Sequence, residues 1–84
     1  MIYKLIFTNR AIKDLKKIDN KIKERIGNKL KIYSKNPLKF GKKLTDPKIG
    51  TYKFKIGDYR VIFDIDDNKI IVLRLGHRKN IYKG

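Results

Sequence analysis

Apolar and basic residues alternate strictly on both sides of Gly57-Asp58, and this alternation predicts a β-hairpin with a tight turn at these two residues. In a two-residue turn, Lys55 lies opposite Arg60 on the neighbouring strand. Successive side chains on a strand point to opposite faces, so the hairpin has one apolar face and one basic face. The apolar face is formed by Tyr52, Phe54, Ile56, Tyr59, Val61 and Phe63, and the basic face by Lys53, Lys55 and Arg60.

Apolar residues recur at helical spacing in two stretches, each preceded by a residue that can cap a helix. The first stretch is Ile12, Leu15 and Ile18 behind Asn9, and the second is Ile22, Ile26, Leu30 and Tyr33 behind Asp19 or Asn20. Asn36-Pro37 ends the second helix, because the residue before a proline avoids helical geometry. The remaining predicted segments are a strand over 2–7, a basic connector over 38–50, strands over 51–56, 59–65 and 69–75, and a polar tail over 76–84.

The predicted order of elements is β-α-α-β-β-β. This order indicates an α+β fold with an antiparallel sheet and two N-terminal helices packed on one face. A chain of 84 residues is expected to form a single domain, residues 1–84, with one modest core.

The turn at Asp66-Asp67-Asn68 leaves two registers open for the last strand. A two-residue turn would bury Arg74, and burying an unpaired guanidinium is prohibitive. A three-residue turn is therefore preferred, which places Arg74 beside Arg60 and puts Ile71, Leu73 and Leu75 in the core. Ile62, Ile70 and Val72 then lie among the cations of the basic face, and we expect a partner to cover this mixed face.

The composition is strongly basic, with 23 Lys and Arg against 8 Asp and Glu, a formal net charge of +15 and a pI of about 10.2. This charge indicates a polyanionic partner, nucleic acid before a membrane surface. No apolar run approaches the roughly 20 residues that span a bilayer, and the start does not read as a secretory signal. The lack of cysteine favours a cytoplasmic location. One His and eight scattered carboxylates predict no metal site and no cofactor.

RNA can be cleaved without a metal when the 2′-hydroxyl attacks the adjacent phosphorus and the 5′-oxygen leaves. This reaction needs a base, cations for the phosphorane charge and an acid for the leaving oxygen. Lys, Arg, Tyr and the single His77 are the groups that this chain offers. A lysine crowded by other cations has a lowered pKa and can serve as the base.

Several stretches together resemble the RelE group of the RelE/ParE toxin superfamily, over nearly the whole chain. One is Lys-x-Lys before the tight turn, followed by Tyr-Arg-Val-Ile-Phe. Another is Leu-Gly-His-Arg with a tyrosine close behind. The opening Ile-Phe-Thr-Asn-Arg-Ala-Ile-Lys-Asp-Leu-Lys-Lys and the later Asn-Pro-Leu are similar as well.

The resemblance implies a toxin of a type II toxin–antitoxin pair, which enters the ribosomal A site, cuts messenger RNA there and is neutralised by an acidic antitoxin. By the same resemblance, Lys53 or Lys55 acts as base or phosphate ligand and Arg60 holds the phosphorane oxygens. Arg78 then stabilises or protonates the leaving oxygen, and Tyr82 stacks on a base or assists proton transfer. His77, where the best-studied type has another cation, is a further catalytic candidate, and the RNA-binding candidates are Arg74, Lys79 and Lys83.

Two other functions compete with mRNA cleavage. A ParE-like toxin would bind DNA gyrase without cutting RNA, but that branch generally lacks the Lys-x-Lys, Arg and terminal Tyr set. A non-catalytic basic RNA-binding domain is the third possibility. The chain has neither the Gly-x-x-Gly clamp of a KH domain nor an RNP-type aromatic motif.

Overall fold

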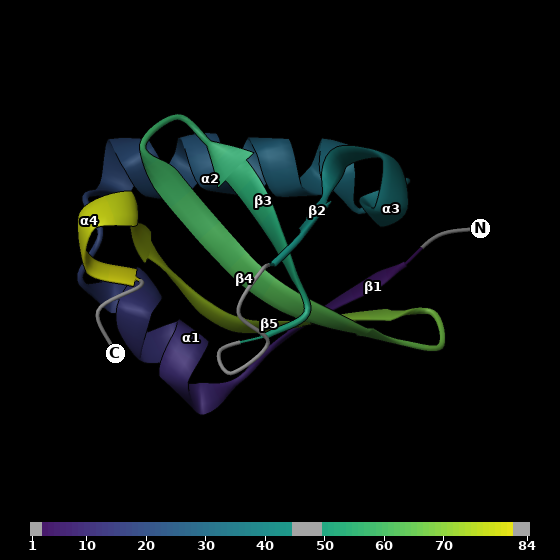
Figure 1. Ribbon diagram of the computed structural model, residues 1–84. Helices are drawn as coiled ribbons and strands as arrows, with labels where there is room; N and C mark the ends of the chain where they lie inside the picture. Colours follow the sequence, from purple (N-terminus) through teal and green to yellow (C-terminus); the bar gives the residue numbers. More distant parts are fainter. Residues whose placement is uncertain (1–2, 45–49, 82–84) are drawn as a thin grey trace.

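The computed structural model describes residues 3–44 and 50–81, which form a five-stranded sheet with helices around it (Figure 1). The strand order is β1-β5-β4-β3-β2. In chain order the elements are β1 (Lys4–Phe7), α1 (Asn9–Lys16), α2 (Asn20–Tyr33), α3 (Pro37–Phe40), β2 (Lys42–Lys43), β3 (Tyr52–Ile56), β4 (Tyr59–Asp66), β5 (Lys69–His77) and α4 (Arg78–Ile81).

The predicted α+β architecture is confirmed, with both N-terminal helices contributing to a single core. Strands β2 to β5 pair antiparallel, whereas β1 pairs parallel with β5, from Lys4 opposite Lys69 to Phe7 opposite Val72. The parallel pair is a departure from the all-antiparallel sheet of the prediction. It is possible because β1 and β5 are far apart in the sequence, and parallel neighbours need a long connection.

The first hairpin has the predicted register. Lys55 lies opposite Arg60 and Ile56 opposite Tyr59 around a two-residue turn. Gly57 has a φ of +59°, which a residue with a side chain rarely adopts, and this explains a glycine at the turn. The parity argument therefore holds along this hairpin. Its inward side chains Phe54, Val61 and Phe63 are completely buried.

The predicted register of the second hairpin is wrong. Asp66 pairs with Lys69 across a two-residue turn, and Ile70 and Val72 lie in the core in place of Ile71 and Leu73. A β-bulge at Leu73 then exchanges the two faces of β5, because Phe63 pairs with Val72 but Ile62 pairs with Arg74. Leu75 consequently faces the core while Arg74 stays out of it. In a regular strand, a two-residue turn would bury Arg74. The bulge allows the two-residue turn and still keeps Arg74 out of the core.

The start of α1 differs from the prediction, whereas the start of α2 agrees with it. Thr8, not Asn9, caps α1, because its Oγ1 accepts a hydrogen bond from the Ala11 amide. Asp19 caps α2 as predicted, accepting from the Lys21 amide. On α1 the predicted Leu15 and Ile18 pack against the core beside the buried Ala11, whereas the predicted Ile12 is 41% exposed. On α2 the stripe is confirmed: Ile26 and Leu30 are buried, and Ile22 and Tyr33 pack beside them.

Segments predicted as irregular contain short regular elements. The connector includes α3, which starts with Pro37 at a position where a missing N–H costs nothing, and the two-residue strand β2. The supposed polar tail instead continues β5 to His77 and turns into α4, whose Ile81 is only 2% exposed. Ile81 therefore anchors the C-terminal segment to the core. No helix in the described part of the chain is long and apolar enough to cross a membrane.

Aromatic rings pack against one another in the core at β3 and β4. The ring centroids of Phe54 and Phe63 are 4.1 Å apart, and those of Tyr33 and Phe54 are 5.2 Å apart. Ile62 on the opposite face is fully buried too, since the backbone at Gly50 passes over it. A Cβ at Gly50 would lie 2.5 Å from Ile62 Cγ2. The apolar part of the basic face is thus covered in part by the chain itself.

Candidate functional site

The predicted basic face exists, and it is larger than the sequence indicated. Lys55 lies opposite Arg60, and Lys53 lies opposite Ile62 on one side and Lys42 of β2 on the other. Directly opposite residues of an antiparallel pair share a face, so Lys42 joins Lys53, Lys55 and Arg60. We call these four residues the cation face. Lys42 and Lys55 are exposed, and Lys53 and Arg60 are half-buried.

The crowding of charges changes the acid–base behaviour of Lys55. The positive charge of Lys53 lowers the pKa of Lys55 below its ordinary value of 10.5, and Lys42, partial loss of hydration and Arg60 lower it further. A lowered pKa means that the amine spends more time in the neutral form, which can accept a proton. Among the cation face residues, Lys55 therefore has the property that a general base requires.

Arg60 and Arg78 both bind residues of the turn between β3 and β4. Arg60 Nη1 donates to the carbonyl oxygens of Gly57, at 2.9 Å, and Tyr59, at 2.8 Å. Arg78 follows β5 and approaches the same turn from α4: its amide donates to Asp58 O at 2.8 Å, and its Nε lies 3.8 Å from Asp58 Oδ1. Both predicted arginines are thus held by residues of the turn between β3 and β4.

His77 lies on the other side of the sheet from the cation face. It is paired with Tyr59, which points toward the helices, whereas Arg60 is paired with Gly76. The His77 and Tyr59 rings are in edge-on contact with centroids 5.5 Å apart. Its Nδ1 accepts a hydrogen bond from the Lys79 amide, so this nitrogen carries no proton in that arrangement. The structure therefore separates His77 from Lys53, Lys55 and Arg60.

Arg74 is held by a partner that the sequence did not reveal. Its Nε donates to Asp14 Oδ2 at 3.0 Å, and the same oxygen accepts from the Leu75 amide at 3.1 Å. Asp14 is 8% exposed and comes from α1. The predicted position of Arg74 beside Arg60 is wrong, because Arg74 is opposite Ile62. Of the other predicted residues, Lys79 is exposed on α4, and Tyr82 and Lys83 lie outside the described residues.

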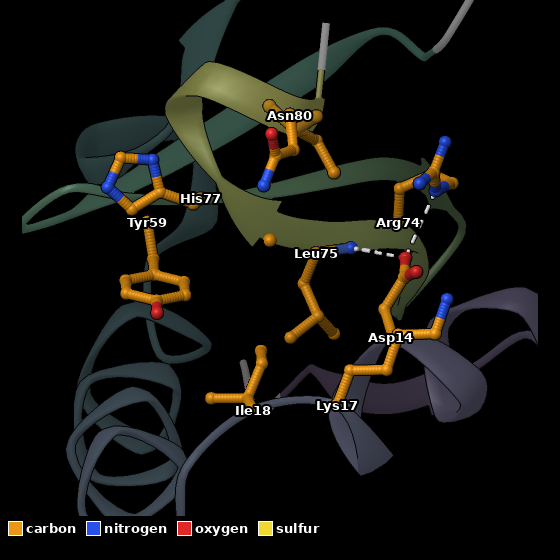
Figure 2. A pocket seen from close by; sticks show the side chains of 10 residues that line it. Asp14, Lys17, Ile18, Tyr59, Arg74, Leu75, His77 and Asn80 are labelled. Carbon is orange, nitrogen blue, oxygen red and sulfur yellow. Dashed lines mark hydrogen bonds and ion pairs between the residues drawn. The ribbon is translucent and has the colours of Figure 1, made fainter. Parts of the chain in front are cut away.

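A cavity of about 270 Å³ lies between the end of α1, β5 and α4 (Figure 2). Asp14 and Arg74 form one wall, Tyr59 and His77 another, and Asn80 points in from α4. None of the four cation face residues lines it. We therefore place the candidate site on the open cation face and not in this cavity, because a long polyanion needs a surface that it can cross.

Sequence reasoning missed three residues that shape the site. Lys42 lies in a strand of two residues, too short for alternation to be recognised. Asp14 and Asp58 hold arginines across long sequence separations, and no local pattern marks such pairs. Within residues 3–44 and 50–81, no three His, Asp or Glu side chains lie close enough together to hold a metal ion.

Known proteins match this chain over almost its full length. A family model described as the ParE toxin of the type II toxin–antitoxin system parDE matches residues 5–82. Toxin RelG of Mycobacterium tuberculosis is 34% identical over 86 residues, covering 99% of each chain. Toxin RelE3 of Methanocaldococcus jannaschii is also 34% identical, covering 94% of each. Among solved structures, the toxin–antitoxin complex RelBE2 from Mycobacterium tuberculosis gives a TM-score of 0.79 at 32% identity, covering 93% of this chain and 100% of that one.

Proposed function

The chain belongs to the RelE/ParE family of toxins of type II toxin–antitoxin systems, and we propose that it is a ribonuclease that cleaves messenger RNA in the ribosomal A site. The observation that carries this proposal is the cation face, where three cations predicted from the RelE resemblance lie together and one of them, Lys55, has a lowered pKa. The crowded cations favour the neutral form of the Lys55 amine, which is the form that a general base needs.

The proposed reaction uses only side chains of this protein. The Lys55 amine accepts the proton of the ribose 2′-hydroxyl as the 2′-oxygen bonds to phosphorus. Arg60 and Lys53 stabilise the negative charge on the non-bridging oxygens of the phosphorane. The bond from phosphorus to the 5′-oxygen then breaks, and the Arg78 guanidinium donates a proton to the leaving oxygen and regains one from water. The products are a cyclic phosphate on one fragment and a 5′-hydroxyl on the other.

The open shape of the site supports the proposal that cleavage depends on the ribosome. The cation face is an open sheet surface, so the chain has few means of holding a single nucleotide in a reactive conformation. In-line attack requires the 2′-oxygen, phosphorus and 5′-oxygen to be aligned, and most of the rate gain from positioning must then come from elsewhere. A ribosome that holds the codon in the A site supplies this alignment.

The direct test of the function is to map the 5′ ends of cellular messenger RNA after brief expression of the chain. New ends within translated reading frames support the proposal. A family model named for ParE toxins gives a specific reason to keep gyrase inhibition as the second candidate function. That function predicts gyrase-linked DNA breaks and unchanged RNA ends in the same cells.

The net charge of +15 predicts how the antitoxin binds. We propose that the partner is an acidic protein, encoded next to this chain, that covers the cation face with an extended or helical segment. Its association rate constant should fall by about ten- to a thousandfold as salt rises from low to high concentration, because opposite charges steer the encounter. Stopped-flow mixing over a salt series measures this, and the dissociation rate serves as the control that should change less. An association rate that does not depend on salt would contradict the electrostatic argument.

Tyr82 is predicted to act through its ring. We expect Tyr82→Phe to retain most of the cleavage rate and Tyr82→Ala to lose about 5- to 150-fold, corresponding to about 1–3 kcal/mol for stacking on one base. Single-turnover cleavage by pre-assembled ribosomes is the measurement, with the Phe variant as the matched control. Equal losses in both variants would assign the role to the hydroxyl, and full activity of Tyr82→Ala would remove Tyr82 from the site.

A further inference from the structure

Lys42 and Lys43 are neighbours in β2 and face opposite sides of the sheet. Lys42 lies opposite Lys53, so it shares the cation face, whereas Lys43 lies opposite Tyr52 on the side of the helices. Both side chains are exposed, and both residues carry the same charge. Lys42 and Lys43 therefore differ mainly in the groups that their side chains approach.

The backbone fixes Lys42 in this place. A Cβ at Gly41 would lie 2.6 Å from Pro37 O and 2.8 Å from Phe63 Cζ, so only glycine fits between α3 and the core. The Gly41 amide donates to Pro37 O at 2.7 Å, and on the far side of β2 the Leu44 amide donates to Thr51 O at 2.9 Å. These contacts on both sides of Lys42 hold β2 against β3. The backbone position of Lys42 beside Lys53 is therefore set by these contacts and does not depend on the conformation of the Lys42 side chain.

Pairing Lys42 with Lys53 costs stability, because like charges opposite each other on neighbouring strands repel. An edge lysine would avoid this cost if β2 were shifted by one residue, since Lys42 would then point to the other face. The pairing also gives Lys55 a third neighbouring cation. The three neighbours are Lys53 on the same strand, Lys42 on β2 and Arg60 on β4.

We propose that Lys42 is a positioning residue for RNA cleavage, and that its charge acts on the reaction through Lys55. This inference rests on the proposed function. A positive charge near an amine disfavours the protonated form, so Lys42 increases the fraction of Lys55 that is neutral and able to accept the 2′-hydroxyl proton. Lys42 lies one diagonal step from Lys55, a Cβ separation of about 7–8 Å in a regular sheet. At this range the charge acts without any direct contact with the reacting atoms.

The variants Lys42→Met and Lys43→Met test the inference, because methionine keeps the apolar stem and removes the charge. The first measurement is an NMR titration of the Lys55 side chain in the isolated protein. The second is the single-turnover cleavage rate on programmed ribosomes, followed from about pH 7 to about pH 9. We expect the Lys55 midpoint to move to higher pH in Lys42→Met. Its cleavage rate should fall about two- to threefold at pH 7, the scale of a like-charge neighbour. This loss should shrink only as the pH approaches the measured Lys55 midpoint, and Lys43→Met should show neither change.

The alternative role for Lys42 is a direct contact with an RNA phosphate, and it gives a different pattern. A phosphate contact would leave the Lys55 midpoint unchanged, weaken binding and reduce the salt dependence of binding. That result would overturn the inference while wild-type cleavage upholds the proposed function. Failure of the wild-type chain to cleave any ribosome-bound RNA would overturn both. Displacement of the midpoint in Lys43→Met as well would also overturn the inference, because the effect would then reflect net charge and not position.

Discussion

Arg60→Ala is expected to reduce ribosome-dependent cleavage by about a hundredfold or more, while the protein remains folded. Removing one preorganised group that stabilises transition-state charge typically costs about a hundred- to a thousandfold in rate. Arg60 lies on the cation face opposite Lys55, and its side chain reaches the Gly57 and Tyr59 carbonyls. The remaining N–H groups of the guanidinium can meet two phosphorane oxygens at once. Single-turnover cleavage on ribosomes measures the rate, and growth arrest on expression provides a cellular measure.

Two control variants separate catalysis from folding. Arg10→Ala removes an exposed arginine of α1 outside the cation face and should retain wild-type cleavage. Arg60→Lys keeps the charge but loses the planar fork, so we expect an intermediate rate. The hydrogen bonds to the turn contribute about 0.5–1.5 kcal/mol each to stability, and urea unfolding of Arg60→Ala should show a loss of that size. Unchanged cleavage in Arg60→Ala would refute the proposed site.

The first hairpin was predictable because every local signal there agrees. The alternation is regular, Gly57 has the conformational freedom that the turn needs, and no bulge interrupts the pairing. The face that carries Lys53, Lys55 and Arg60 follows from parity alone. This part of the candidate site could therefore be placed from the sequence, although its extension by Lys42 could not.

The second hairpin was not predictable by the same reasoning, because parity is lost at a bulge. The sequence of β5 gives no sign of the extra residue Leu73, and an argument from constant alternation must choose one register for the whole strand, although the pairing changes at the bulge. Arg74 was correctly kept out of the core, but for an incomplete reason. It is not exposed on an open face, because Asp14 from α1 reaches it across about 60 residues of sequence.

The partners that the fold gives to each residue also limit the prediction of the functional site. The resemblance to RelE proteins placed His77 and Arg78 in the same catalytic set, yet the chain turns between them. His77 is still in β5 and lies against Tyr59, whereas Arg78 begins α4 and approaches Asp58. Neighbours in a motif thus contact different parts of the fold. Sequence order alone cannot assign both of them to one site.

Asp14 has a structural role that explains its burial. Strand β1 covers the edge of β5 only as far as Val72, and beyond it α1 provides the partners for the strand. The Thr8 amide donates to Val72 O, Thr8 Oγ1 donates to Leu73 O, and the Leu75 amide donates to Asp14 Oδ2. Asp14 therefore satisfies a buried backbone donor and the Arg74 guanidinium with one oxygen. It replaces the missing strand at the point where β1 ends.

Asp14→Ala is expected to lower the free energy of unfolding by about 2–4 kcal/mol, because it leaves the Leu75 N–H and the Arg74 guanidinium without an acceptor. Urea unfolding followed by circular dichroism measures the loss. Asp58→Ala is the matched control: its ion pair with Arg78 is 3.8 Å long and both side chains are more than half exposed, so about 1 kcal/mol or less is at stake. Equal effects of the two variants would contradict the role assigned to Asp14.

The double variant Asp14→Ala/Arg74→Met separates the contributions of Arg74 and of the Leu75 N–H to the loss of stability. Methionine removes the unpaired charge, so the double variant should recover the part of the loss that comes from Arg74. What remains is the cost of the unsatisfied Leu75 N–H, expected at about 1–3 kcal/mol. Cleavage by the Arg74→Met single variant then tests the predicted RNA contact. If Arg74 is held mainly to secure the β5 edge, the rate of that variant should stay within about threefold of wild type, since Arg74 would then make no contact with charge that develops in the transition state.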